Sequence, residues 1–395
     1  MTNLPVIVSG LLIVQLYGFI NAVVSLIASN LILAVIRFTV ARVAHNSRMS
    51  TLDLSRKFLG NRGAIFIAFV LLFSTLILFT EETSLAGKYL SFLFKINEGQ
   101  NVDLPIQFGV GIGILSTLLC MEGIVALRRS AVIFFPLIIL LLVVVVFLSN
   151  GKAVSLNEMP FSWSSFSYGT SLMVATGLGI TADLPTFFRH RRSWRDSVIA
   201  IIYIQIIMFI VGFLSLYLGM LVDPVSGLNI SDPSTISPLF RISLIMFILI
   251  STVFANVANI YSASVGWEAL APKSLIGRGE YLILGLGLVA SYVSFTSLIN
   301  TGTMLSVSED FLVLLCVLFI AGYFIQLLSK KSPSSNEQLI YIISFVLSSV
   351  LICLQEYNVI NFRFPIIVAG VSLEIFVLLL GFLFKKILFK PKLLP

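Results

Sequence analysis

Hydrophobic positions along this 395-residue chain form long runs, neither alternating nor amphipathic, that recur from one end to the other. A bilayer core about 30 Å thick requires roughly 20 apolar residues per helix, and most of the runs reach that length. Together with turn and charge signals they predict an all-α polytopic membrane protein of twelve spans. The spans are expected at about residues 4–18, 20–40, 63–85, 105–127, 130–149, 165–184, 197–221, 238–265, 281–299, 303–328, 338–355 and 363–385.

The first two runs are the least regular. Residues 4–36 carry no charged side chain and must hold two spans, with only Gly18 to Asn21 available as a turn. The first span is therefore short. We expect either that it begins deep in the membrane or that the chain start is truncated relative to its relatives. No small-residue cleavage site follows this run, so a removable signal peptide is not expected.

Basic residues predict the orientation, because Lys and Arg remain on the cytoplasmic side while acidic residues contribute little. With both termini in the cytoplasm, 20 of the 25 Lys and Arg residues fall on the inner side, and a shift by one helix would destroy this asymmetry. The five on the outer side are Lys88, Lys95, Lys152, Arg241 and Arg363. The net charge of +7 therefore implies anionic lipid at a plasma or inner membrane, and no nucleic-acid partner.

Composition narrows the chemistry further. With 58% hydrophobic and 11% charged residues and a mean hydropathy of +1.05, the chain has no room for a soluble domain. The cysteines Cys120, Cys316 and Cys353 lie in apolar runs without paired spacing, and the two histidines, His45 and His190, lie in basic loops. We therefore expect no metal centre, no organic cofactor and no catalytic site. Transport is the favoured class. The longest loops, near 41–62 and 86–104, hold few acid and base pairs, which disfavours an enzyme acting on lipid-linked substrates.

Two predicted helices are interrupted by glycine. They are the first, with VSGLL at Val8 to Leu12, and the sixth, with ATGLG at Ala175 to Gly179. Transporters built from inverted repeats bind substrate where two matching helices are broken, and these two are five helices apart. The alternative is that the glycines only permit close helix packing.

Polar residues inside the predicted spans are the remaining candidates for a site, because charged groups there normally face an interior or a cavity. Thr75, Leu78 and Glu82 share one stripe of their helix, which makes Glu82 a candidate polar or protonatable group; alternatively, the helix ends there in water. Asn256 and Asn259 lie near one face, where they would hydrogen-bond either a heterocycle or a neighbouring helix. Glu309, Asp310 and Glu374 are candidates for proton coupling; alternatively, they lie in a wet vestibule or mark a shortened span. Asn30 is a candidate for a hydrogen bond between helices.

Three motifs resemble one family. GITADLPTFFR, ending at Arg189, resembles the Thr-Ala-Asp-aromatic signature of the cytosine permease and nucleobase:cation symporter family. ANVANIYSASVGWEAL at 255–270 resembles its Asn-rich eighth helix, and SRKFLGNRGA at 55–64 resembles its loop between helices 2 and 3. The chain is thus similar to a divergent member of that family, over about residue 5 to the C-terminus.

The resemblance implies a single transporter domain over 1–395, with two inverted repeats of five helices. The repeats would cover about 4–149 and 165–299, and two extra helices about 338–385. It implies import of a nucleobase-like molecule with a cation, Na+ or H+. Asp183 and the following arginines would belong to an inner gate. The implied substrate-binding residues are Gly10, Thr75, Leu78, Glu82, Thr176, Gly177, Asn256 and Asn259.

The chain also departs from the family pattern. Leu78 and Val174 stand where the family has the aromatic residues that sandwich a planar ring. Phe254 and Ala255 stand where it has sodium-binding hydroxyl groups. We therefore expect a secondary transporter for a small nitrogenous solute. The alternative is a degenerate permease that senses a ligand or has a structural role. The sequence does not predict an oligomeric state.

Overall fold

The computed structural model of the chain contains helices at eleven of the twelve predicted spans. It describes residues 10, 13–94, 104–148, 159–178, 181–189, 193–221, 237–271, 278–295, 301–329, 333–360 and 365–388, whose regular structure is all helical. The elements are α2 (Phe19–Ser47), α3 (Thr51–Leu93), α4 (Leu104–Cys120), α5 (Ile124–Leu148), α6 (Trp163–Leu178), η1 (Thr181–Asp183), α7 (Leu184–Phe188), α8 (Trp194–Leu221), α9 (Pro238–Leu270), α10 (Arg278–Phe295), α11 (Thr301–Ser329), α12 (Ser335–Glu356) and α13 (Ile366–Leu388).

Within the described residues, nine helices are long and apolar enough to cross a membrane, and α4 and α10 are shorter apolar helices. The predicted all-α fold class is confirmed, and the chain is an integral membrane protein. Eleven of the twelve predicted spans coincide with these helices. The first, at 4–18, lies largely outside the described residues.

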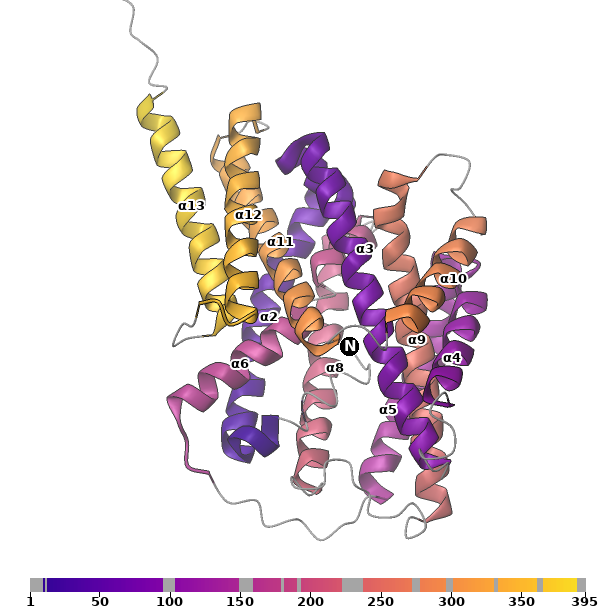
Figure 1. Cartoon of the computed structure of the whole chain (residues 1–395). Helices are drawn as coiled ribbons and strands as arrows, with labels where there is room; N and C mark the ends of the chain where they lie inside the picture. The colour runs from indigo at the N-terminus through magenta and orange to yellow at the C-terminus, as the bar shows by residue number, and fades with distance from the viewer. Residues whose placement is uncertain are drawn as a thin grey trace, which may run out of the picture.

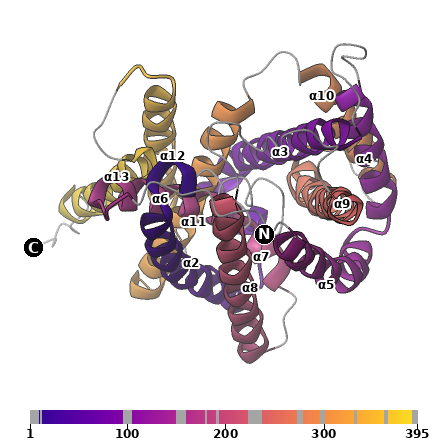
Figure 2. The same ribbon diagram turned by 90° about the horizontal axis from the view of Figure 1, so that it is seen from below.

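The helices gather into two groups joined by α11 (Figures 1 and 2). In the first group α2 packs against α6 and α8, and in the second α3 packs against α4, α9 and α10, its most extensive contact being with α9. α11 contacts helices of both groups, α2 and α6 on one side and α3 on the other. α12 and α13 pack on each other at the edge of the molecule.

α3 is longer than the sequence pattern predicted. A capping box between Ser50 and Asp53 starts it at Thr51, inside the segment expected to be a loop. Gly60, with φ of 72°, bends it before the membrane-spanning part. The helix then continues to Leu93, about eight residues beyond the expected end at 85. Glu82 therefore lies inside the helix and is 1% exposed, so the alternative in which the helix ends there in water is wrong.

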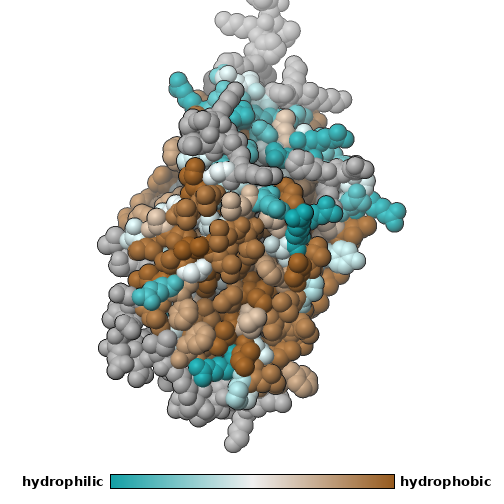
Figure 3. All heavy atoms as spheres, turned by 90° about the vertical axis from the view of Figure 1, so that its right-hand side faces the viewer, coloured by the Kyte–Doolittle hydropathy of each residue, from teal (hydrophilic) through white to brown (hydrophobic). Residues whose placement is uncertain are grey.

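The outer surface fits a lipid environment. Large apolar side chains such as Leu31, Val35 and Phe147 are 65%, 68% and 76% exposed. Figure 3 shows apolar residues covering the middle of one face, with hydrophilic residues concentrated toward one end. A contiguous apolar surface of this extent requires a membrane to cover it.

Candidate functional site

The predicted interruption of α6 is present. The described part of α6 ends at Leu178. The described chain begins again at Thr181, in the short 3-10 turn η1 that leads into α7, whose second residue is Pro185; residues 179–180 lie outside the described residues. Gly177 lies in the last turn of α6, and a Cβ placed there would come within 2.5 Å of a methyl group of Leu33 on α2. This glycine therefore permits close packing and also stands at a helix break, so both interpretations of the motif apply to it.

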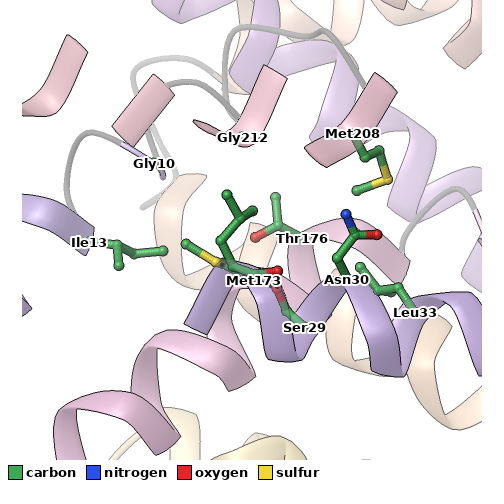
Figure 4. A pocket seen from close by; sticks show the side chains of 11 residues that line it. Gly10, Ile13, Ser29, Asn30, Leu33, Met173, Thr176, Met208 and Gly212 are labelled. Atoms are coloured by element: carbon green, nitrogen blue, oxygen red, sulfur yellow. Dashed lines mark hydrogen bonds between the residues drawn. The ribbon is translucent and has the colours of Figure 1, made fainter. Parts of the chain in front are cut away.

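A cavity lies beside this break, among α2, α6, α8 and the segment before α2 (Figure 4). Three of the predicted binding residues line it, namely Gly10, Thr176 and Gly177. The other lining residues are Ile13, Leu26, Ser29, Asn30, Leu33, Met173, Met208 and Gly212. The predicted break at residues 8–12 lies outside the described residues except for Gly10.

The cavity is small and mostly apolar. Its volume is about 50 Å³, enough for a few water molecules and too small for a heterocycle in this conformation. Its polar groups are partly used, since the hydroxyl of Thr176 donates to Leu172 O at 2.7 Å and that of Ser29 donates to Leu26 O at 3.0 Å. As predicted, Asn30 binds a neighbouring helix: its amide donates to Gln205 O at 3.3 Å.

The other five predicted residues lie elsewhere, on α3 and α9, and none of them lines this cavity. Asn259 donates to a carboxylate oxygen of Glu82 at 3.1 Å, and Asn256 donates to the hydroxyl of Thr83 at 3.0 Å. Thr75 bonds to backbone carbonyls within α3, and Leu78 is half-buried. Of the two alternatives for Asn256 and Asn259, a heterocycle or a neighbouring helix, these contacts are those of the neighbouring helix, α3.

Asp183 joins the two helix groups. Its carboxylate accepts hydrogen bonds from Thr51 of α3 at 3.1 Å and from Ser262 of α9 at 2.7 Å. The hydroxyl of Thr186 donates to Thr51 at 3.1 Å, which extends the network into α7. Asp183 is 6% exposed. A carboxylate beyond the end of α6 therefore ties this part of the chain to α3 and α9.

Arg37 is a residue whose contacts the sequence pattern did not indicate. It is one of the 20 basic residues counted on the inner side and lies near the end of the predicted span at 20–40; in the structure it lies within α2 and is 0% exposed. Its guanidinium bonds to Gly177 and Thr181, on the two sides of the α6 break, and to Gln205 of α8. Its spacing in the sequence could have indicated this, because Arg37 lies one helical turn after Leu33 and two turns after Asn30. Both of these residues line the cavity.

The three remaining acidic candidates are also buried, which excludes a wet vestibule in this conformation. Glu309, Asp310 and Glu374 are 8%, 4% and 0% exposed. Both carboxylate oxygens of Glu374 lack a hydrogen-bond partner among the described residues. In the same part of the chain no group of three His, Cys, Asp or Glu residues is arranged to hold a metal ion.

Comparison with known proteins shows the fold. Neither a family model nor a curated protein sequence matches the chain. Among solved structures, it is similar to Mhp1, a nucleobase-cation-symport-1 family transporter, in a closed conformation with bromovinylhydantoin bound. The TM-score is 0.71 at 14% identity, covering 98% of this chain and 90% of Mhp1. A manganese transporter of Eremococcus coleocola gives a TM-score of 0.50 at 14% identity, with 98% and 84% covered. The fold implied by the three sequence motifs is thus confirmed.

Proposed function

We propose that this protein is a secondary transporter that imports a small nitrogenous solute, similar to a nucleobase, together with a cation. The observation that carries the proposal is an interrupted membrane-spanning helix, α6, facing a cavity within a transporter fold shared over 98% of the chain. Broken helices within a membrane expose backbone groups that can bind polar solutes, provided that they face a protein interior. The termini would be cytoplasmic, in a plasma or inner membrane.

Transport would require a change of conformation. The cavity of about 50 Å³ has room only for water, so a solute would bind after the helix groups move apart and the space beside α6 enlarges. The bonds from Asp183 to Thr51 and Ser262 connect the two groups and would have to break in such a step. Alternating access of this kind moves one group of helices against the other around a central site.

The polar pairs of α3 and α9 would supply the specific contacts. Carboxamides both donate and accept hydrogen bonds, so Asn256 and Asn259 would exchange Thr83 and Glu82 for the heteroatoms of the solute. Asn256 already has a buried carbonyl oxygen with no partner among the described residues. Glu82, next to this site, would carry a coupling proton; Na+ is the alternative cation.

The solute would not be held by a stack of rings. Leu78 and Val174 are half-buried aliphatic residues at the two positions where the resemblance implies aromatic ones. Val174 packs against the cluster that contains Leu33 and Ala175. Since aromatic stacking contributes roughly 0.5 to 1.5 kcal/mol beyond burial, a flat ring would bind weakly and a smaller or non-planar solute is favoured.

A small cavity and the absence of an aromatic pair at Leu78 and Val174 also favour a second function, ligand sensing. A degenerate permease that binds a ligand without moving it would keep the fold and the helix break and lose transport.

Ligand binding is tested first, by thermal stabilisation of the detergent-purified protein. A ligand that binds only the folded state raises its apparent stability by mass action. The panel would contain nucleobases, pyrimidine derivatives, hydantoins and small amides, each with and without sodium. A midpoint that rises with one nitrogenous compound supports the proposal, and the sodium comparison begins to identify the cation. No shift with any compound would contradict a nitrogenous solute.

A further inference from the structure

Arg37 is the largest fully buried side chain among the described residues, and it lies inside a membrane-spanning helix. Ionised side chains in such helices are costly and normally pair with an opposite charge or with backbone carbonyl groups. The two ion pairs in the described part of the chain join Arg56 to Asp53 and Arg129 to Glu122. Within that part, Arg37 therefore has no carboxylate partner.

Neutral acceptors surround Arg37 instead. Its Nε donates to the hydroxyl of Thr181 at 3.1 Å, and its Nη2 donates to the carbonyl oxygen of Gly177 at 2.5 Å. Its Nη1 donates to the side-chain oxygen of Gln205 and contacts the sulfur of Met208. One cation is thus surrounded by a carbonyl, a hydroxyl and a carboxamide oxygen.

Two of these oxygens belong to opposite sides of the α6 break. The last carbonyls of a helix have no amide partner within the helix, and Gly177 is the second-to-last residue of α6. Its carbonyl oxygen accepts from Arg37 and, at 3.2 Å, from the hydroxyl of Thr181 beyond the break. Arg37 therefore holds together the two ends of the interrupted helix and fixes both to α8 through Gln205.

Neutral oxygens at a helix break are the ligands that membrane transporters offer to small cations. We propose that Arg37 is a built-in cation of the α6 break: its guanidinium occupies the place, and binds the oxygen atoms, that an exchangeable monovalent cation would otherwise need. An arginine does not lose its proton in a protein, so this charge is permanent. The break then keeps its geometry without Na+ or K+, and any coupling cation binds elsewhere.

The position of the charge has a second consequence, which rests on the proposed function. Met208 and Leu33 line the cavity (Figure 4), as does Gly177. Gly177 and Met208 contact Arg37, and Leu33 lies one turn before it on α2. A fixed positive charge at the edge of the cavity repels cationic solutes. The solute class is therefore neutral or anionic.

Thermal unfolding tests the built-in cation without a transport assay, so its result is independent of the solute. Arg37→Gln removes the charge and retains donors, whereas Arg37→Lys retains the charge. Each purified variant would be melted in choline, sodium and potassium chloride of equal concentration. The exposed Arg56→Gln is the matched control, since it removes an arginine from the surface.

We expect the wild type, Arg37→Lys and Arg56→Gln each to melt at one temperature in all three salts. Arg37→Gln is expected to melt lower than the wild type in choline and to rise by about 2 °C or more in sodium or potassium. An Arg37→Gln midpoint equal to the wild type in choline, or equally low in all three salts, would overturn the proposal. If Arg37→Gln does not accumulate, folded Arg37→Lys supports the proposal and loss of both variants contradicts it.

Discussion

Replacement of Asn256 by alanine separates the solute site from helix packing. Asn256 is 0% exposed, and its amide donates to the hydroxyl of Thr83 across the contact between α9 and α3. We expect Asn256→Ala to lose most of its uptake at solute concentrations well below saturation, while the protein still folds and reaches the membrane, because the amide is assigned to the solute more than to the fold.

The structure sets the magnitudes. One hydrogen bond between membrane helices stabilises by about 0.6 kcal/mol on average, and this variant loses one. It also removes a buried carbonyl oxygen without a partner among the described residues, whose burial costs about 1 to 3 kcal/mol. The net of these two terms is a rise in the free energy of unfolding of about 0.4 to 2.4 kcal/mol, so the variant should remain folded. Loss of a hydrogen bond to the solute, about 1.5 kcal/mol, corresponds to about a tenfold loss of affinity.

The assay is initial uptake of a labelled solute into proteoliposomes, with the melting midpoint measured on the same preparation. Thr83→Val is the matched control, because it removes the same bond between helices and leaves the amide in place. Wild-type uptake by Asn256→Ala would refute the assignment. Equal loss of uptake in Asn256→Ala and Thr83→Val would show that Asn256 acts through helix packing.

Three further substitutions test other parts of the account. Glu82→Gln should remove the pH dependence of uptake if Glu82 carries the proton, and an unchanged pH profile would leave Glu82 only its bond to Asn259. Gly177→Ala places a Cβ 2.5 Å from Leu33 and should lower the free energy of unfolding by about 1 to 3 kcal/mol, measured by thermal melting. Its control is Gly287→Ala, which meets nothing within 4 Å and should be neutral or stabilising; equal effects would refute the packing argument. Glu374→Met should raise the melting midpoint and leave uptake unchanged, because it removes two carboxylate oxygens that are buried without a partner among the described residues. Loss of uptake would instead give Glu374 a part in coupling.

Membrane-spanning helices could be predicted from the sequence because their length and apolarity are local properties. Their ends were harder to predict. The capping box at Ser50 starts α3 within a basic segment, and α3 continues past Glu82 because that carboxylate finds Asn259 inside the protein. A hydropathy pattern predicts a helix end at such a glutamate, because it contains no information about a hydrogen-bond partner on a helix far along the chain.

The candidate site could be predicted only in part. The break at Gly177 is visible as a glycine motif, and the cavity beside it contains Thr176 and Gly10 as expected. That the α3 and α9 residues do not line this cavity could not be seen, because the packing of distant helices decides it. The contacts of Arg37 were missed for the same reason: it was counted only as a basic residue of the inner side, and its hydrogen-bond partners are 140 or more residues away.

The central claim is that the protein moves a solute, and concentrative uptake tests it most directly. Wild-type protein in sealed proteoliposomes would be given the compound that stabilises it, with and without an imposed proton or sodium gradient. We expect the compound to accumulate inside the proteoliposomes above its outside concentration. This accumulation should be lost when the gradient is dissipated. Binding without accumulation under either gradient would contradict transport and identify the protein as a membrane receptor with a permease fold.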